Sequence, residues 1–536
     1  DRVARHRMRG ARADEARGEL FEIGLAHDER AGRAQARHGD GVALVVGKTN
    51  LDQFATGLVG TRTPHPVPRN AVDPALVPGG SSSGSAVAVA HGLVAFSLGT
   101  DTAGSGRVPA ALNNIVGLKP SLGAISATGL VPACRTLDTI SVFALTAEDA
   151  YDALRAAAAY DAADPYSRPV PLPPPGACPA GLRVGIPGAG SLPFFGDRVQ
   201  EASFRASVAA LAEAGLQVVE LDFAPFHAIA EMLYEGAWVA ERHAAVEEIL
   251  TRSPEALYPV TRRIIAPSTG LSATDAFRGF YRLEALKRAV EPALAAVDLL
   301  CVPSVPTLCS LAEIETDPVG PNSRLGTYTN FVNLLGLSGL ALPTAPRADG
   351  RPGSVTLLAG AGQDALLASI ALGPMRRAGG ALDPGRLGAT AHVPPAPPAP
   401  ATGPLPGEIE IAVCGAHMAG LPLNGELACR GGRFLRAVET APLYRLYALP
   451  GGPPLRPGLV RFETGGAAIG VEVWALPAEA VGPFLAGIPS PLGLGTLQLA
   501  DGTAPKGFLC EQAALAGAED VTPFGCWRAV LAARAG

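Results

Sequence analysis

A proline-rich segment late in the chain limits the folds that are open to this protein. Residues 392–408 read HVPPAPPAPATGPLPGE. Proline lacks the backbone N–H that a sheet ladder needs, and closely spaced prolines hold a chain extended and stiff. The segment therefore cannot lie inside a sheet, and it predicts a linker over residues 386–407. This linker would separate a large domain, residues 41–385, from a smaller one, residues 408–536.

The larger domain has the alternating texture of an α/β fold. The run GVALVVGKTN, residues 41–50, reads as a buried strand of β-branched residues that leads into a turn. Residues 199–222 then show helical periodicity, a glycine at the expected helix end and an alternating strand. Strands and helices in this order predict a sheet that is covered by helices.

The smaller domain shows a different pattern. Its apolar runs are short and alternating, with turn residues between them: EIEIAVCGAHMAGLPLN, LYRLYALPG, LVRFET, GVEVWALP and GTLQLADG. Runs of this kind are typical of β-strands joined by tight turns. The second domain is therefore expected to be mostly β.

Composition argues against several classes of partner and cofactor. The 536 residues carry a formal net charge of -6 and no stripe of basic and aromatic residues, which argues against nucleic acid. The longest apolar runs are too short to span a bilayer, so no membrane association is expected. The eight cysteines lack CxxC spacing and do not pair with histidines at ligand spacing. We therefore expect no metal and no other cofactor, and reduced thiols favour the cytoplasm.

Two glycine- and serine-rich stretches are candidates for a catalytic site. The first, VPGGSSSGSAVAVAHG, covers residues 77–92, and the second, SLGTDTAGSGRVPAALNN, covers residues 97–114. On its own, a serine run between glycines is more often a turn or a linker. The second stretch places Ser105 in a glycine-rich turn, where consecutive N–H groups can point at a developing oxyanion. A nucleophile and its oxyanion hole could thus share one loop.

Taken together, the two stretches resemble the amidase signature family. GGSSSGSA is followed by GTDTAGSGRVPAALNNIVGLKP, GKTNLDQFATG stands upstream, and the two serines are 24 residues apart (105 - 81 = 24), like the family's serine pair. The resemblance implies an α/β fold with a mixed sheet covered by helices, and amide hydrolysis by a Ser-cisSer-Lys triad. Ser105 would be the nucleophile, and Ser81, after a cis peptide bond, would relay its proton. The resemblance also implies an oxyanion hole made by the backbone N–H groups of Thr102, Ala103, Gly104 and Ser105.

The lysine of the triad is missing from the position where the resemblance puts it. The family takes it from a KDN-type motif about forty residues before GKTN, which would fall near Arg7 here. A guanidinium stays protonated and cannot accept the serine proton. Lys48, within GKTN, is better explained as a residue that closes a strand. Because residues 1–40 are rich in arginine and lack the family's apolar pattern, we expect them to be a frame-shifted or truncated start.

Two further segments resemble the allophanate hydrolases within that family. LYEGAWVAERHAAVEE places Tyr234 and Arg242 eight positions apart (242 - 234 = 8), two helical turns on roughly one face. GPNSRLGTYTNFVNLLGL, residues 320–337, resembles the same enzymes. By this resemblance Tyr234 and Arg242 hold the substrate, and an arginine fork suits a small carboxylate. Without it, a core aromatic residue and a solvated arginine explain the pair equally well. Arg324 is a weaker second candidate, with a surface ion pair as its default explanation.

The smaller domain resembles the C-terminal domain of the allophanate hydrolases, which implies a γ-glutamyl cyclotransferase-like β fold. The resemblance also implies that this domain decarboxylates N-carboxycarbamate, the product of the first domain. His417, in a turn after a strand, would be the acid/base group, because the pKa of histidine is near neutrality. Lys506 could place a positive charge near a carboxylate. A lone histidine in such a turn is otherwise more often structural.

For the whole chain, the resemblance implies hydrolysis of allophanate to ammonia and carbon dioxide in urea degradation. It further implies a homodimer that acts on a small-molecule substrate and has a functional link to urea carboxylase. Two alternatives stay open. One is an amidase of a different specificity, which broad hydrolysis of simple amides would support. The other is a pseudoenzyme that binds substrate without turnover because the lysine is missing.

Overall fold

A computed structural model describes residues 45–390, 392–393 and 399–535 of the chain. The chain divides into two compact units, and each of them is built from two stretches of sequence. The first unit contains Asp1–Val170 and Arg183–Pro397, and the second contains Pro171–Leu182 and Pro398–Gly536. The domain boundaries expected from the sequence differ here, because they leave residues 171–182 in the larger domain. The segment expected to be frame-shifted, residues 1–40, lies outside the described residues.

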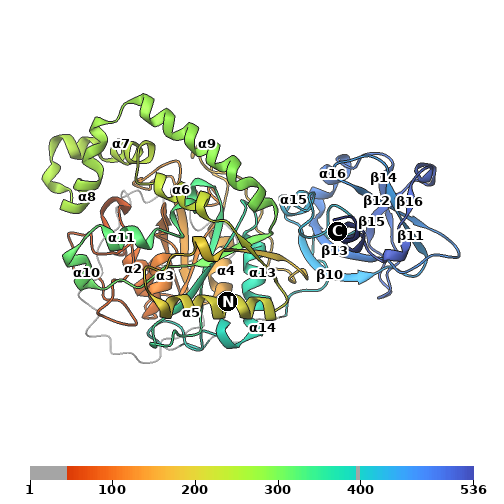
Figure 1. Cartoon of the computed structure of the whole chain (residues 1–536), viewed down its shortest axis with the longest axis horizontal. Helices are drawn as coiled ribbons and strands as arrows, with labels where there is room; N and C mark the ends of the chain where they lie inside the picture. The colour runs from red at the N-terminus through yellow and green to blue at the C-terminus, as the bar shows by residue number, and fades with distance from the viewer. Residues whose placement is uncertain (1–44, 391, 394–398, 536) are drawn as a thin grey trace. The chain divides into compact units, whose positions relative to one another are not determined.

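The first unit is built on a mixed sheet of eight strands (Figure 1). In order across the sheet, the strands are β1 (Phe96–Asp101), β3 (Thr139–Ala144), β2 (Val116–Lys119), β7 (Ser338–Thr344), β8 (Gly353–Ala359), β6 (Leu299–Pro303), β4 (Arg183–Pro187) and β5 (Gln217–Leu221). Strand β4 pairs in parallel with β5 and β6, and the other neighbours are antiparallel. The mixed sheet implied by the resemblance is therefore confirmed.

The helices of the first unit surround this sheet. They are α2 (Ser83–Ala90), α3 (Val108–Leu112), α4 (Ala147–Ala157), α5 (Arg198–Glu213), α6 (Ala224–Met232), α7 (Ala237–Arg252), α8 (Pro259–Ile265), α9 (Ala273–Ala295), α10 (Leu311–Thr316), α11 (Gly320–Leu325), α12 (Asn330–Leu334), α13 (Asp364–Ile370) and α14 (Arg376–Ala378). Helices α2, α3, α4, α5 and α13 pack directly on strands. Side-chain caps fix several helix starts, as where Thr146 accepts the N–H of Asp149 at the start of α4.

Two predictions about secondary structure have different outcomes. Helix α5 and strand β5 confirm the helix and strand predicted within residues 199–222, and Gly215 between them has a φ of +94°. The buried strand predicted at residues 41–50 is wrong for its described part. Residues 45–50 form no strand, and Val45 and Val46 are 73% and 66% exposed. An apolar run becomes a strand only beside a partner strand, and the described sheet starts at β1.

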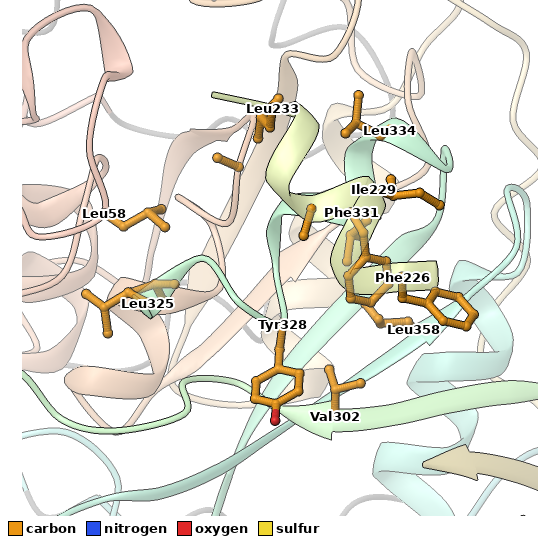
Figure 2. Close-up of a cluster of buried hydrophobic side chains, with 14 of the residues drawn as sticks. Leu58, Phe226, Ile229, Leu233, Val302, Leu325, Tyr328, Phe331, Leu334 and Leu358 are labelled. Carbon is orange, nitrogen blue, oxygen red and sulfur yellow. The ribbon is translucent and has the colours of Figure 1, made fainter. Parts of the chain in front are cut away.

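A cluster of buried apolar side chains joins the helices α6 and α12 to the loops that carry the candidate site (Figure 2). Phe223 stacks on Phe226 with 4.4 Å between ring centroids, and Phe331 of α12 meets Phe226 edge-on at 5.4 Å. Leu58 and Ala103 belong to the same cluster and are almost fully buried. Close packing of this kind leaves the packed elements little room to move relative to one another. The core therefore fixes α12 against the loop that follows β1.

The second unit is rich in β-structure, as predicted. Its strands are β9 (Glu408–Val413), β10 (Arg433–Glu439), β11 (Tyr444–Leu449), β12 (Arg456–Arg461), β13 (Gly470–Pro477), β14 (Leu492–Thr496), β15 (Lys506–Cys510) and β16 (Glu519–Asp520). They form a five-stranded sheet in the order β10-β13-β9-β15-β14 and a three-stranded sheet in the order β12-β11-β16. The helices are α15 (Gly425–Ala428), α16 (Ala478–Ala486) and α17 (Trp527–Ala535). Because β14 ends at Thr496, most of the run GTLQLADG lies outside a strand.

Candidate active site

Ser105 lies in the loop between β1 and α3, and the carboxylate of Asp101 shapes this loop. Asp101 Oδ1 accepts the N–H of Gly104 at 2.9 Å, and Oδ2 accepts the N–H of Gly106 at 3.0 Å. Gly104 has a φ of +127°, and a Cβ at this position would lie 2.4 Å from Thr329 Oγ1. Only glycine fits there. Ser105 itself is 1% exposed, so the loop presents it to the interior of the unit.

A buried ion pair ties this loop to helix α12. Arg107 donates to both oxygens of Asp101 at 2.9 Å, and both side chains are fully buried. The Nη2 of Arg107 also reaches Asn333 Oδ1, and Asn333 Nδ2 donates to the carbonyl of Asp101. Burial alone would raise the pKa of Asp101, but the charge and hydrogen bonds of Arg107 hold it below the usual value. The carboxylate therefore stays ionised and keeps the loop in place.

Ser81 is held through the backbone of a second buried aspartate, Asp52. The peptide bond between Gly80 and Ser81 is cis, as the resemblance implied, and Ser81 is fully buried. The N–H of Asp52 donates to the carbonyl of Ser81 at 3.0 Å. A Cβ on Gly80 would lie 2.1 Å from Asp52 Oδ2, so no side chain fits there. Asp52 thus positions the turn from which Ser81 projects.

The two serine hydroxyls share an unusual property. Neither Ser81 Oγ nor Ser105 Oγ has a hydrogen-bond partner within the described part of the chain, although both are buried. A buried hydroxyl without a partner is costly, and such groups cluster where a reaction needs them. Both hydroxyls therefore keep their hydrogen-bonding capacity free for a group that the structure does not contain.

Among the proposed oxyanion donors, the structure distinguishes Gly104 from the rest. The N–H of Gly104 already donates to Asp101, so it could hold an oxyanion only by sharing its hydrogen. The N–H groups of Thr102, Ala103 and Ser105 make no hydrogen bond within the described residues. The hydroxyl of Thr102 donates to the carboxylate of Asp138. Burial raises the pKa of Asp138, and the hydrogen bond from Thr102 opposes this shift.

The structure brings Tyr234 and Arg242 together, but not in the way that their spacing predicted. Tyr234 lies after α6, and α7 begins only after Gly236, so the prediction of one continuous helix is wrong. Gly236 has a φ of +56° and breaks the helix. The Arg242 guanidinium nevertheless lies over the Tyr234 ring, with 5.2 Å between Cζ and the ring centroid. In the described part, Arg242 Nε, Arg242 Nη2 and Tyr234 OH have no partner.

Asp138 connects this pair to the loop that carries Thr102 and Ser105. It accepts a hydrogen bond from Thr102, and it lies close enough to Arg242 for their charges to interact. Arg324, the weaker candidate, lies on α11 with its Nη2 3.8 Å from Glu313. This contact agrees with the default explanation of Arg324 as a surface ion pair. Of the two arginines, Arg242 is therefore the better candidate for binding a substrate carboxylate.

His417 of the second unit lies in the loop after β9, as predicted. Its Nε2 is 3.2 Å from Glu426 Oε2, and its ring stacks on Phe508 with 5.0 Å between centroids. Burial lowers the pKa of His417, and Glu426 only partly opposes this shift. The imidazole is thus neutral at pH values where a free histidine begins to protonate. Lys506 of β15 is exposed and donates to Thr496 Oγ1 at 3.0 Å.

Lys119, to which the sequence assigned no role, lies at the end of β2 and is fully buried, within reach of the charge of Asp101. Its Nζ donates to the carbonyls of Leu337 at 2.8 Å and Pro120 at 3.2 Å. Burial lowers the pKa of Lys119 to about 8, and the negative charge of Asp101 opposes this shift. A lysine at the end of the apolar strand β2 was the signal in the sequence.

Replacing Lys119 with methionine should flatten the response of stability to alkaline pH. Because burial sets the folded-state pKa at about 8 against an ordinary 10.5, the unfolded chain binds more protons between these values. The wild-type protein should therefore gain stability over the variant as the pH rises through this window, by about 3 kcal/mol at most. Urea unfolding of both proteins on either side of this window measures the difference. An identical pH response in the two proteins would contradict the assignment.

Three findings on the described residues concern metal sites, disulfide bonds and membrane spans. No group of three or more histidine, cysteine, aspartate or glutamate side chains there is arranged to hold a metal ion. The cysteines form no disulfide bond with one another in the described part of the chain. None of the helices in the same part of the chain combines the length and the apolar character needed to cross a bilayer. In the first unit the candidate site offers serine, arginine and tyrosine side chains, and the second unit separately offers the histidine described above.

Comparisons with known proteins agree with this geometry. A family model described as "Amidase" matches residues 40–368, and one described as "Allophanate hydrolase C-terminal domain" matches residues 409–532. Urea amidolyase from Saccharomyces cerevisiae is 40% identical over 501 residues, which are 91% of this chain but only 27% of that protein. The 2-amino-5-chloromuconic acid deaminase from Comamonas testosteroni is 32% identical over 68% of this chain and 77% of its own.

A solved structure extends the similarity over both units. The structure of Kluyveromyces lactis allophanate hydrolase is 40% identical, with a TM-score of 0.66, over 91% of this chain and 81% of that one. A crystal structure of K. lactis urea amidolyase matches with a TM-score of 0.65 over 91% of this chain and 30% of its own. The chain thus spans about a quarter to a third of the urea amidolyases that it matches.

Proposed function

This chain belongs to the amidase family, and we propose that it hydrolyses allophanate to ammonia and carbon dioxide, with Ser105 as its nucleophile. The observation that carries the proposal is the set of buried polar groups without partners in the described part of the chain. Two serine hydroxyls supply a nucleophile and a proton relay, while Tyr234 and Arg242 supply donors for an anion. Allophanate needs both, because it carries an amide beside a carboxylate. The similarity of this chain to allophanate hydrolase over both units favours this activity over an amidase of another specificity.

The first half of the proposed reaction takes place on the loop that Asp101 shapes. Ser105 Oγ attacks the terminal amide carbonyl and passes its proton to Ser81. The oxyanion forms next to the N–H groups of Thr102, Ala103 and Ser105, and Gly104 joins them by sharing its hydrogen. Ser81 in turn gives its own proton to the amide nitrogen, which leaves as ammonia, and a carbamate ester between Ser105 and the remaining carboxyl-carbamoyl group is left. Water then cleaves this ester and releases N-carboxycarbamate.

Substrate orientation falls to Arg242 and Tyr234 in this proposal. The free donors of the Arg242 guanidinium can take both oxygens of the substrate carboxylate, and the Tyr234 hydroxyl can donate beside them. Holding the carboxylate fixes the amide relative to Ser105, which converts a bimolecular encounter into an oriented one. No side chain of the described residues accepts a hydrogen bond from Ser81 Oγ.

The second half of the reaction is proposed for the second unit. Loss of carbon dioxide from N-carboxycarbamate breaks a C–N bond, and the electron pair that remains on nitrogen needs a proton. Because burial lowers its pKa, protonated His417 beside Glu426 is a stronger acid than a free imidazolium. It gives its proton to this nitrogen and takes another from water, while Lys506 attracts the carboxylate. The carbamate that is left breaks down to ammonia and carbon dioxide. We further propose that the chain works as a homodimer in the cytoplasm, where a urea carboxylase supplies its substrate. The lack of disulfide bonds among the described cysteines fits a reducing compartment.

Ammonia and carbon dioxide released from allophanate by this chain test both halves, with acetamide as the comparison substrate. We expect ammonia from allophanate and much less from acetamide, because only allophanate engages Arg242. His417→Asn should keep the first ammonia and slow carbon dioxide release by about tenfold or more. Comparable rates on both substrates would favour a general amidase. A folded protein that binds allophanate in calorimetry yet releases no ammonia would overturn the hydrolase assignment.

A further inference from the structure

The buried arginines of the described residues fall into two groups. Arg107, Arg347 and Arg433 each pair with a carboxylate, at 2.9, 3.1 and 2.6 Å respectively. Arg62 and Arg242 are each 1% exposed, and neither forms an ion pair with any described residue. A guanidinium that is taken out of water without a counterion is strongly unfavourable. Asp52 acts on Arg62, and Asp138 and Glu241 act on Arg242, only through charge interactions without a direct ion pair. The direct contact that each guanidinium lacks could therefore be supplied by an anion from outside the chain.

Arg62 is held in place without using all of its donors. Its Nη1 donates to the carbonyl of Thr56 at 2.9 Å, and its Nη2 donates to the carbonyl of Pro318 at 2.8 Å. Its Nε is buried and has no partner within the described chain. Both acceptors are neutral carbonyls, so the positive charge is not balanced by them. The side chain is thus rigid, charged and left with one free N–H.

The nearest carboxylate to Arg62 is already committed to the backbone. Asp52 Oδ1 accepts the backbone N–H of Arg62 at 2.7 Å, and Oδ2 accepts that of Gly60 at 2.9 Å. Burial raises the pKa of Asp52, and the charge of Arg62 opposes this shift. Burial also lowers the pKa of Arg62. Asp52 therefore positions the turn and does not form an ion pair with the guanidinium.

Thr56 brings the two unpaired arginines to one place. Arg62 donates to its carbonyl, and Arg242 Nη1 lies 3.4 Å from its hydroxyl oxygen. The hydroxyl hydrogen of Thr56 goes to the carbonyl of Phe54, so this oxygen acts as an acceptor for Arg242. The two guanidinium groups are thus separated by a single residue, and Tyr234 lies against one of them. Like charges this close repel each other unless an anion lies between or beside them.

We propose that Arg62 is a second guanidinium of the anion subsite and determines specificity for substrates that carry a carboxylate beside the amide. Arg242 offers two free donors, and Arg62 Nε offers a third. A carboxylate has enough lone pairs to accept from all three. A neutral group in the same position would leave both buried guanidinium groups without a direct ion pair. The inference rests on the proposed function, because it names a residue that selects the substrate of that same site.

Calorimetry with two isosteric ligands tests this inference. The ligands are allophanate and biuret, in which a neutral amide replaces the carboxylate, and the host is the Ser105→Ala protein, which should bind without turnover. Adding Arg62→Met should weaken allophanate binding by about tenfold to a hundredfold and change biuret binding by less than about threefold. Arg62→Lys should lie between the two for allophanate. The matched control is Arg262→Met on the exposed face of α8.

Each outcome of this experiment decides a separate point. If the Ser105→Ala protein binds no allophanate, the proposed function fails before Arg62 is considered. If it binds allophanate and Arg62→Met weakens both ligands equally, Arg62 only braces Thr56 and Pro318, and the inference is overturned. If Arg62→Met does not fold, as judged by circular dichroism, the Lys variant decides. It keeps the charge, so it must weaken allophanate binding more than biuret binding for the inference to stand.

Discussion

Replacing Ser105 with alanine should lower the rate of ammonia release from allophanate by at least about a thousandfold. The hydroxyl oxygen forms the covalent bond to the acyl group, and no neighbouring side chain can replace it in that bond. Stability should change by less than about 1 kcal/mol, because Ser105 Oγ bonds to nothing in the described part of the chain. Ammonia assays and thermal unfolding of the same preparation measure the two effects.

A matched serine variant makes this result specific. Ser83 lies two positions after Ser81 in the same run, and its hydroxyl makes only a long contact, 3.4 Å, to the carbonyl of Asn50. Ser83→Ala should keep activity within about threefold, whereas Ser81→Ala should lose most of it. If Ser105→Ala retains a tenth of the wild-type rate, Ser105 is not the nucleophile.

Asp101→Asn should have the largest effect on stability, because it breaks the buried pair with Arg107. The guanidinium would be left buried without a counterion, which costs about 3–5 kcal/mol of unfolding free energy. An amide also presents one acceptor oxygen where the carboxylate presents two, so the N–H groups of Gly104 and Gly106 cannot both be satisfied. Urea unfolding should show the loss of unfolding free energy. Ammonia release should also fall, because the loop that carries Ser105 loses the hydrogen bonds that fix it.

The control for this prediction is an ion pair on the surface. Glu201 and Arg205 form an i,i+4 pair on α5, with the arginine 55% and the glutamate 30% exposed. Glu201→Gln should cost no more than about 0.5 kcal/mol, since water screens such pairs. If Asp101→Asn costs as little as Glu201→Gln, the buried pair does not hold the loop.

Local spacing explains why the centre of the site could be predicted. Ser81, Ser105 and the glycines around them lie within two short stretches of sequence, so a local motif is enough to single them out. The cis bond before Ser81, which the resemblance of these stretches to the amidase signature family implied, is present. The place of His417 was likewise predictable, because a turn after an apolar strand is a local feature.

Features that depend on distant residues could not be predicted in this way. The need for glycine at position 104 comes from Thr329, which packs against it from far along the chain. The unpaired state of Arg62 is visible only when all side chains around it are placed. The spacing of Tyr234 and Arg242 predicted that both lie on one helix. Gly236, with its positive φ, breaks that helix, and the two side chains meet instead through a cation–π contact. An apolar run at residues 45–50 gave no sign that it would lack a partner strand.

The interleaved path of the chain limits how this protein can be taken apart or recombined. Pro171–Leu182 leaves the first unit, joins the second and then returns. Within the second unit, the N–H of Ala177 donates to the carbonyl of Phe434 at 3.2 Å, and Gly176 lies against the same carbonyl. A gene fragment that starts at the proline-rich segment would therefore encode a β domain with part of its own surface missing. The two halves are not interchangeable cassettes: a transplant of the second unit would have to carry this internal segment along, for example as a circularly permuted insert.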